Sequence, residues 1–229
     1  MNTQPVLDVQ NLTKIYPGVI ALDNVHIQIK PGEVHALIGE NGAGKSTLIK
    51  CITGAVAPTS GEISFCGQRL DRITPQSAIE LGISAIYQEF NLVPYLSVAE
   101  NIMIGRYPNR LHIVNDKKMR QAAQAIIEEL GVPIDIDVAV QELSVGYQQL
   151  VEIAKAVSRD AKMLIMDEPS AALTNNELHY LFEIIKRLRK KGISILYISH
   201  RLEEIFEICD RVTVFRDGRY IDTVNIEQT

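Results

Sequence analysis

The sequence predicts an α/β fold with a mostly parallel sheet, an antiparallel β subdomain and an inserted helical subdomain. Three short, continuously apolar segments, at 83–87, 163–166 and 193–198, are typical of strands buried on both faces of a parallel sheet. Residues 90–160, in contrast, carry mostly helical patterns. With 46% hydrophobic and 22% charged residues, the 229-residue chain has the composition of an ordinary folded domain.

The antiparallel part is indicated near both ends of the chain. Residues 25–29 alternate between apolar and polar side chains, the period of a half-buried antiparallel strand. Pro31-Gly32 breaks this pattern, and a buried strand is predicted over 33–38. Later, Asp217-Gly218 separates two strand-like segments, which is the signal of a β-hairpin.

Helices are predicted by periodicity and by their end signals. One covers 116–130, with Asp116 as its candidate cap and Gly131 as its stop. Another covers 177–191 and ends at Gly192.

Residues 39–46 read GENGAGKS, a full match to G-x-x-x-x-G-K-[ST], between a predicted strand and a predicted helix. This loop wraps nucleoside triphosphate phosphates with backbone N–H groups, and the following helix directs the positive end of its dipole at them. A chance glycine-rich turn would lack the strand–loop–helix context. Lys45 is placed to reach the β and γ phosphates, and the Ser46 hydroxyl to hold Mg²⁺. The predicted nucleotide-contacting residues here are Gly39, Glu40, Asn41, Gly42, Ala43, Gly44, Lys45, Ser46 and Thr47.

We therefore expect a phosphate-loop NTPase core in a single domain over residues 1–229. The nucleotide-binding core and its antiparallel part are expected at about 1–89 and 161–229, and the helical subdomain at about 90–160.

Polar residues follow the other buried strands where each strand ends. Ligands bind at the carboxyl ends of strands in such sheets, so Gln88, Asp167, Glu168 and His200 are expected to converge on the phosphate loop. Each alone would read as a solvated or capping residue. An Asp after four apolar residues is the pattern that orders the Mg²⁺ shell in phosphate-loop NTPases.

The neighbouring residues have complementary predicted roles. Glu168 can orient and polarise an attacking water, which favours hydrolysis over transfer to a bound acceptor. His200 could contact the γ-phosphate, and Gln88 could report its presence to a neighbouring loop through Mg²⁺ or water. We therefore assign Glu168, His200 and Gln88 to catalysis, and Ser46, Gln88 and Asp167 to the metal.

A second anion-binding element is predicted inside the helical region. Residues 143–149 read LSVGYQQ and open a helix through Val157, with Ser144 as its N-cap. Val145-Gly146 allow close backbone approach at the helix N-terminus, so Ser144 and Gly146 are predicted to contact the nucleotide. Taken alone, the segment also fits an ordinary capped helix.

In this order the motifs resemble those of the ATP-binding subunits of ABC transporters. GENGAGKS is similar to the phosphate loop of that family, Gln88 to its Q-loop, LSVGYQQ to its signature motif and MLIMDEP to its Mg²⁺ strand with the catalytic glutamate. His200 matches its switch histidine, residues 171–174 its D-loop, and Tyr16 the aromatic residue that stacks on adenine. The resemblance covers essentially all 229 residues and implies the ABC ATPase fold, with ATP and Mg²⁺ as its ligands.

Flanking segments such as YQEFNLVPYLSVAENI and DEPSAALT resemble the N-terminal ATPase domain of bacterial monosaccharide importers of the ribose, galactose and arabinose type. Val145 replaces the first glycine of the usual signature LSGGQ, as is common in that group, whereas Tyr147 stands where the glutamine would be. The D-loop has Ala171 and Thr174 in place of the common serine and aspartate, which also suits the sugar group.

The resemblance implies partners. ATP would lie between the phosphate loop of one ATPase domain and the signature helix of another, and their closure would drive an integral membrane permease supplied by an extracytoplasmic solute-binding protein. Two such domains are usually fused in one chain, so we expect either a fragment of a tandem protein or separate subunits that pair. The expected location is peripheral, on the cytoplasmic face of the membrane.

Composition weighs against other classes. A net charge of −5 disfavours a nucleic-acid-coating protein, so no nucleic acid partner is expected. A soluble ABC-type ATPase acting in translation or DNA repair is the alternative; a binding-only regulatory subunit and a phosphate-loop kinase fit the motifs less well. No apolar run is long enough for a membrane span, the N-terminus lacks signal-peptide features, and three widely spaced cysteines indicate free thiols without a metal site.

Overall fold

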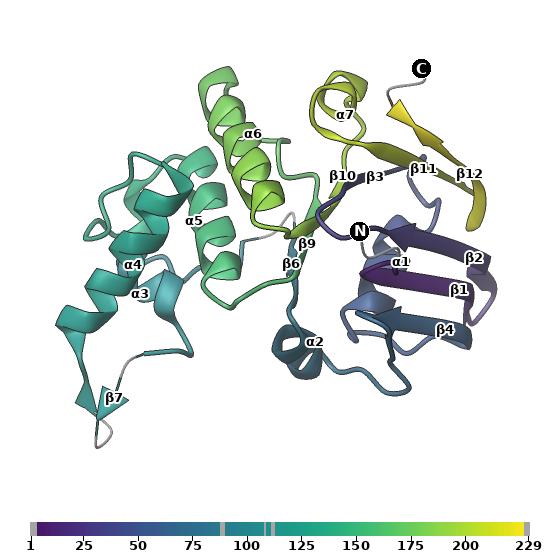
Figure 1. Ribbon diagram of the computed structural model, residues 1–229, viewed down its shortest axis with the longest axis horizontal. Coiled ribbons are helices and arrows are strands. Elements are labelled where there is room, and N and C mark those ends of the chain that lie inside the picture. The colour runs from purple at the N-terminus through teal and green to yellow at the C-terminus, as the bar shows by residue number, and fades with distance from the viewer. Residues whose placement is uncertain (1–3, 88–89, 108, 111–112, 227–229) are drawn as a thin grey trace.

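The computed structural model describes residues 4–87, 90–107, 109–110 and 113–226, and its largest element is a six-stranded sheet (Figure 1). The strands lie in the order β12-β11-β3-β10-β9-β6. All neighbouring pairs are parallel except β11 with β12, so the prediction of a mostly parallel sheet is confirmed. In chain order the strands of this sheet are β3 (Val34–Ile38), β6 (Ile83–Ile86), β9 (Met163–Asp167), β10 (Ser194–Ile198), β11 (Arg211–Arg216) and β12 (Arg219–Asn225).

A second sheet is antiparallel, with the order β2-β1-β4-β5, as the alternating pattern at 25–29 predicted. Its strands are β1 (Leu7–Tyr16), β2 (Val19–Ile29), β4 (Ser60–Phe65) and β5 (Gln68–Arg69). The short strands β7 (Asn109–Arg110) and β8 (Ile113–Val114) pair separately.

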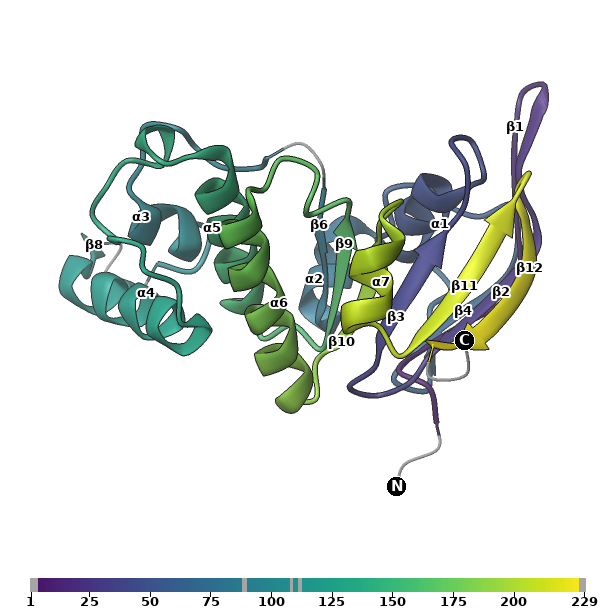
Figure 2. The ribbon, with the colours of Figure 1, turned by 90° about the horizontal axis from the view of Figure 1, so that it is seen from above.

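Figures 1 and 2 show how the helices are distributed along the molecule. Helices α3, α4 and α5 gather at one end of the molecule, the antiparallel sheet lies at the other end, and the six-stranded sheet lies between them. The helices are α1 (Lys45–Ile52), α2 (Pro75–Leu81), α3 (Val98–Met103), α4 (Asp116–Leu130), α5 (Val145–Val157), α6 (Asn175–Lys190) and α7 (Leu202–Ile208).

The core explains why the central strands are continuously apolar. Alternate residues of β9 enter two separate hydrophobic clusters: Leu164 and Met166 pack with the helices, whereas Met163 and Ile165 pack with α1 and the antiparallel sheet. Because both faces of the strand are buried over Met163 to Met166, these four positions must all be apolar, and the polar Asp167 comes only at the partly exposed end.

Two helix starts differ from the sequence prediction. Asp116 is the first residue of α4 rather than its cap; the Asn115 side chain caps the helix by accepting a hydrogen bond from the Lys118 N–H at 3.0 Å. Both residue types are good caps, so periodicity alone does not choose between neighbours. Helix α6 begins at Asn175, not at Glu177, because Thr174 provides its cap.

The C-terminal hairpin is confirmed. Strands β11 and β12 pair across Asp217-Gly218, whose φ angles are 50° and 76°. Positive φ at both positions is the requirement of a type I′ turn, which Asp-Gly sequences meet at low steric cost.

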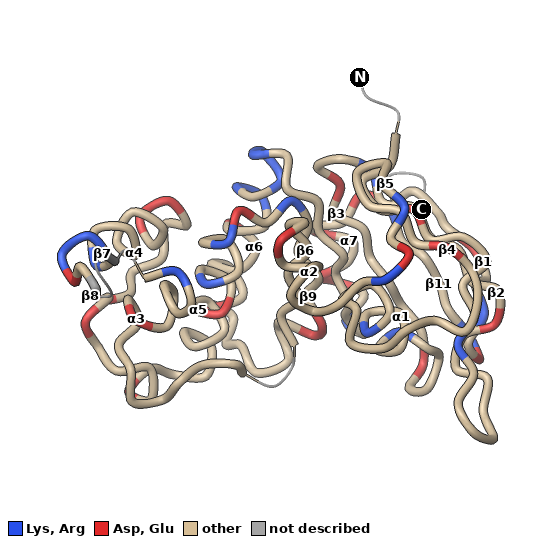
Figure 3. The backbone as a smooth tube through the Cα atoms, turned by 90° about the horizontal axis from the view of Figure 1, so that it is seen from below, with Lys and Arg blue, Asp and Glu red and all other residues tan. Residues whose placement is uncertain are grey.

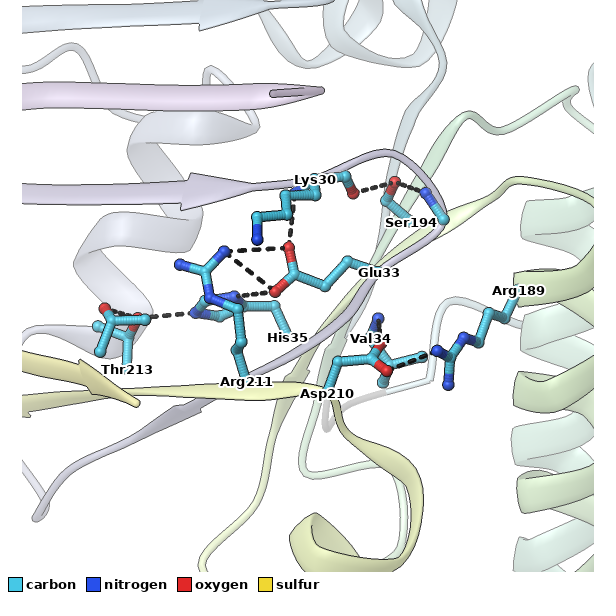
Figure 4. Close-up of polar contacts among 11 residues, drawn as sticks. Lys30, Glu33, Val34, His35, Arg189, Ser194, Asp210, Arg211 and Thr213 are labelled. Carbon is cyan, nitrogen blue, oxygen red and sulfur yellow. Dashed lines mark hydrogen bonds and ion pairs between the residues drawn. The ribbon is translucent and has the colours of Figure 1, made fainter. Parts of the chain in front are cut away.

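A buried polar network lies at the start of β3, the strand that leads to the phosphate loop, and connects it to β11 (Figure 4). The imidazole of His35 lies between Glu33 Oε1, at 3.0 Å, and Thr213 Oγ1, at 2.7 Å. Arg211 Nη1 lies 3.3 Å from Glu33 Oε1. Burial alone would raise the pKa of the Glu33 carboxyl, which is 5% exposed, but the hydrogen bond and charge of His35, the Lys30 N–H and Arg211 together hold it below the ordinary value.

This network predicts an acid-sensitive contribution to stability. A carboxyl whose pKa is lowered by folding stabilises the protein above its ordinary pKa of 4.5, and this contribution is lost as the pH falls through the lower pKa of the folded state. We expect Glu33→Gln to cost about 2 kcal/mol at pH 7, because the partners of a buried charge lose their counterpart. The difference from the unsubstituted protein should shrink below about pH 4.

Urea unfolding at several pH values measures this difference. Glu62→Gln is the control, because Glu62 forms an exposed ion pair with Arg69 that should contribute well under 1 kcal/mol. A Glu33→Gln effect of the same size at acid and neutral pH would rule out the ionised carboxylate as its source.

The surface carries both signs of charge. Figure 3 shows Lys and Arg interspersed with Asp and Glu along the backbone, with a basic group at the end of α6 formed by Arg187, Arg189 and Lys190. Cations there complement the negative end of the helix dipole. No helix in the described part of the chain combines the length and apolar character that crossing a bilayer would take.

Candidate nucleotide site

The phosphate loop joins β3 to α1 and is pressed against two other parts of the chain. A Cβ on Gly44 would lie 2.7 Å from the Ala21 carbonyl oxygen, and one on Gly39 would lie 2.5 Å from the Phe215 carbonyl oxygen. Gly42 and Gly44 also have positive φ angles of 83° and 98°. Backbone conformation and close packing therefore both require glycine here. Without side chains at these positions, the backbone N–H groups of the loop are accessible to a ligand.

The phosphate loop has the charge and the hydrogen-bond donors that bind an anion. Lys45 Nζ donates hydrogen bonds to the carbonyl oxygens of Gly39 at 2.5 Å and Glu40 at 3.1 Å, so the ammonium group lies over the loop. Among the described residues, Lys45 forms no ion pair with a carboxylate at 4.0 Å or less, and Asp167 is a carboxyl whose pKa its charge influences. Ser46 and Thr47 follow in the first turn of α1, whose N-terminus favours negative charge. A bound phosphate would therefore lie close to both the Lys45 ammonium group and the N-terminus of α1.

A cleft of about 570 Å³ opens beside the loop. It is lined by Gly39, Glu40, Asn41, Lys45, Glu168, Ser199 and His200. The residues come together because β3, β10 and β9 are parallel neighbours whose carboxyl ends share one edge: Ile198 pairs with Leu37 on one side and with Asp167 on the other. The predicted convergence of Lys45, Glu168 and His200 is therefore what the fold produces.

Glu168 is held in an unusual backbone conformation. Its φ is 51°, in the left-handed region, and its N–H donates to the Ile198 carbonyl at 2.9 Å. Its carboxylate Oε1 lies 3.3 Å from Nδ1 of His200. The glutamate side chain is 28% exposed and the histidine 70%, so both reach the open cleft. Local strain of this kind is often retained where a side chain must be aimed.

Asp167 and Glu168 place two carboxyl groups in succession at the edge of the sheet. Burial, together with the charge of Glu168, raises the pKa of the Asp167 carboxyl, and the charge of Lys45 partly opposes this shift. A bound cation would stabilise the ionised form. No cluster of three or more His, Cys, Asp or Glu suited to a metal occurs among the described residues. The two carboxylates of Asp167 and Glu168 fit Mg²⁺, which binds to one or two carboxylates together with substrate phosphates and water.

Tyr16, Ser144 and Gly146 do not line this cleft. Tyr16 ends β1, where Lys14 Nζ lies 5.0 Å from its ring centroid, and it is not among the residues lining the cleft. Ser144 caps α5 as predicted, accepting a hydrogen bond from the Tyr147 N–H, but neither Ser144 nor Gly146 lines the cleft. Helices α5 and α1 lie on opposite sides of the β6–β9 edge of the sheet in Figures 1 and 2. Gln88 lies outside the described residues.

The structure adds two residues to the sequence-based list. Ser199 lines the cleft one position before His200, where its place after a buried strand was the available signal. Glu177 contacts Ser144 and lies against Gly146. Its spacing from Thr174 signals a capping box, which the structure contains, but the sequence does not indicate its contact with α5.

We expect Gly44→Ala to weaken ATP binding and lower the melting temperature, because the added methyl group meets both strained backbone and Leu22 Cδ2 at 2.8 Å. Gly42→Ala is the matched control: its φ is equally positive, but nothing lies within 4 Å of the added Cβ. Thermal melts and nucleotide titration of both variants separate strain from packing. Equal effects of the two substitutions would show that close packing at Gly44 is not the cause.

Comparison with known proteins shows which family has this arrangement of motifs. The sequence profile described as "ABC transporter" matches residues 22–171, which include the phosphate loop, the signature segment and the Asp167-Glu168 pair. The chain belongs to the ABC transporter family. The prediction made from the motifs is thereby confirmed.

Individual relatives of this ABC-family chain agree. It is 50% identical over 224 residues to the ribose import ATP-binding protein RbsA 1 of Rubrobacter xylanophilus, covering 98% of this chain and 45% of that protein. It is 46% identical over 228 residues to the galactose/methyl galactoside import ATP-binding protein MglA of Haemophilus influenzae, covering 100% and 45%. The chain thus spans about 45% of the length of these relatives.

The fold agrees as well. The crystal structure of a nucleotide-free ATP-binding cassette from an ABC transporter superposes with a TM-score of 0.88 at 31% identity, covering 97% of this chain and 92% of that one. The predicted ABC ATPase fold, with its antiparallel β part and helical part, is confirmed.

Proposed function

We propose that the chain binds and hydrolyses ATP and thereby powers import of a monosaccharide through a membrane permease, at the cytoplasmic face of the membrane. The observation that carries this proposal is the cleft in which Lys45 of the phosphate loop faces the Glu168–His200 pair. Residues of about 1–89 and 161–229 would form the nucleotide-binding core, and residues of about 90–160 the helical part with the signature segment.

The geometry suits hydrolysis. The loop N–H groups and Lys45 would hold the phosphates and stabilise the negative charge that develops on them. Mg²⁺, held by Asp167 and the Ser46 hydroxyl, would neutralise phosphate charge. Glu168 would orient and polarise the attacking water, and His200 would fix the direction of that carboxylate through the 3.3 Å contact. Water is the expected acceptor because the Glu168 carboxylate, which lines the cleft, can orient and polarise it.

A second ATPase domain is part of the proposal. The N-terminus of α5, with Ser144 and Gly146, carries the other anion-binding element, yet it does not line the cleft of the same chain. Its ligand would then be the γ-phosphate bound in another domain, with two half-sites closing head to tail around ATP. That domain is either a fused half or another copy; relatives about twice as long as this chain are consistent with a fused half.

The sugar class rests on similarity. Relatives at 46–50% identity are named as ribose or galactose/methyl galactoside import ATP-binding proteins. The choice of sugar would belong to the permease and to an extracytoplasmic binding protein.

Tagging the protein at its genomic locus tests the proposal. Membranes are solubilised in mild detergent and the co-purifying proteins are identified. A multi-span membrane protein in stoichiometric amount is the expected result, with ATP turnover that does not respond to added nucleic acid. Recovery with ribosomes or DNA, without a membrane protein, would instead support a soluble ABC-type ATPase acting in translation or DNA repair.

A further inference from the structure

The carboxylate of Glu177 lies at the N-terminus of the signature helix α5, although it belongs to α6. Ser144 Oγ donates a hydrogen bond to Glu177 Oε1 at 2.6 Å. The other carboxylate oxygen, Oε2, accepts hydrogen bonds from the N–H and the hydroxyl of Thr174, both at 2.9 Å. One carboxylate therefore caps α6 and binds the residue that caps α5.

The same side chain fills the space beside Gly146. A Cβ at Gly146 would collide with the carboxyl carbon and both oxygens of Glu177, and Glu177 is only 7% exposed. The hydrogen bond from Ser144, followed by those from Thr174, lowers the pKa of Glu177, so the group is an anion at neutral pH. A buried anion at a helix N-terminus is stabilised by the helix dipole.

The Ser144–Glu177 hydrogen bond occupies the hydroxyl that a phosphate at this helix end would need as a donor. The Ser144 hydroxyl has one hydrogen, and it is donated to Glu177, while its lone pairs face the Tyr147 N–H at 3.3 Å. A phosphate at this helix end would meet a hydroxyl without a free hydrogen and a neighbouring negative charge. Two anions at one helix terminus repel each other.

We propose that Glu177 acts as an internal competitor of the γ-phosphate: it holds Ser144 in a state that cannot donate to phosphate, and ATP-driven pairing of domains must break the Ser144–Glu177 hydrogen bond. The inference rests on the proposed function, in which α5 contacts ATP held by a second domain. Glu177 is a positioning residue, since it acts through Ser144. Thr174 ends the segment that follows Glu168, so the Glu177 carboxylate, which accepts from both Thr174 and Ser144, links that segment to the signature helix.

Glu177→Gln tests this mechanism because it should make ATP-driven dimerisation easier, whereas the loss of a purely structural contact would not. The glutamine carbonyl can still accept from Thr174 and cap α6, whereas its amide can donate to Ser144 Oγ and release the hydroxyl hydrogen. In a Glu168→Gln background, where ATP persists, we expect the ATP concentration for half-maximal dimerisation to fall about tenfold in sedimentation velocity. With Glu168 present, the KM for ATP should fall while kcat changes little.

Glu100→Gln is the matched control. Glu100 forms the same capping box with Ser97 on α3, with contacts of 2.7 and 2.8 Å, and has no contact with Ser144 among those described. It should leave dimerisation unchanged. Thermal melts of both variants measure the cost of the lost cap, and Glu177→Ala, which removes the charge without a new donor, is a second test in the same direction.

The outcomes are distinct. Weaker or unchanged dimerisation of both Glu177 variants, with Glu168→Gln alone dimerising in ATP, would overturn the competitor role and leave the proposed function standing. If Glu168→Gln alone did not dimerise in ATP, the paired-domain function would be contradicted first.

Discussion

Replacing Glu168 by glutamine is expected to leave ATP binding intact and to lower turnover by about two to four orders of magnitude. The substitution keeps the size of the side chain but removes the carboxylate that lies 3.3 Å from His200 and faces the cleft. A neutral amide polarises water poorly, whereas the phosphate loop that binds the nucleotide is untouched. Steady-state phosphate release and equilibrium ATP binding measure the two properties separately.

The control for Glu168 is Glu207→Gln, which removes one exposed carboxylate on α7 and should change neither property. Substantial residual hydrolysis in the Glu168 variant would show that another group activates the water. A loss of ATP binding in parallel with turnover would indicate a disturbed cleft, given the left-handed backbone at this residue.

Replacing Lys45 by alanine is expected to weaken ATP binding by about a hundredfold or more. The ammonium group provides charge-assisted hydrogen bonds to phosphate, each stronger than a neutral one. The same group donates hydrogen bonds to the carbonyl oxygens of Gly39 and Glu40, so its removal also takes these two hydrogen bonds from the loop. Isothermal titration with a slowly hydrolysed ATP analogue gives the affinity.

Lys50→Ala serves as the control for Lys45, because Lys50 is an exposed cation on the last turn of the same helix. The two variants lose the same charge and differ only in position. Undiminished nucleotide affinity in Lys45→Ala would refute the assignment of the phosphate loop.

Local motifs made much of the site predictable. The phosphate loop is contiguous in sequence, and its flanking strand and helix are signalled by burial and periodicity. The positions of Asp167, Glu168 and His200 followed from one rule: parallel strands that are apolar throughout must be central, and their carboxyl ends share an edge. Ser144 was predicted as a cap because capping is also a local property.

What the sequence did not reveal depends on contacts between distant segments. Glu177 is 33 residues from Ser144, and its packing against Gly146 depends on how α6 lies beside α5. The network of Glu33, His35 and Thr213 likewise joins β3 to β11, and the local sequence Glu33-Val34-His35 does not indicate this contact. The misplaced cap at Asp116 has a simpler cause, since two adjacent residues were equally suitable.

In the proposed function, each ATP site combines the phosphate loop of one domain with the signature helix of another. Mixing two inactive variants tests this arrangement. Lys45→Ala disables the loop, and Ser144→Asn keeps α5 capped without a second carboxylate beside Glu177, while its bulkier side chain occupies the space where phosphate would bind. In a mixed pair, one site combines the intact loop of the Ser144 variant with the intact signature of the Lys45 variant. ATP hydrolysis well above the sum of the separate variants is the predicted result, and activity equal to that sum in preparations shown to contain mixed pairs would contradict it.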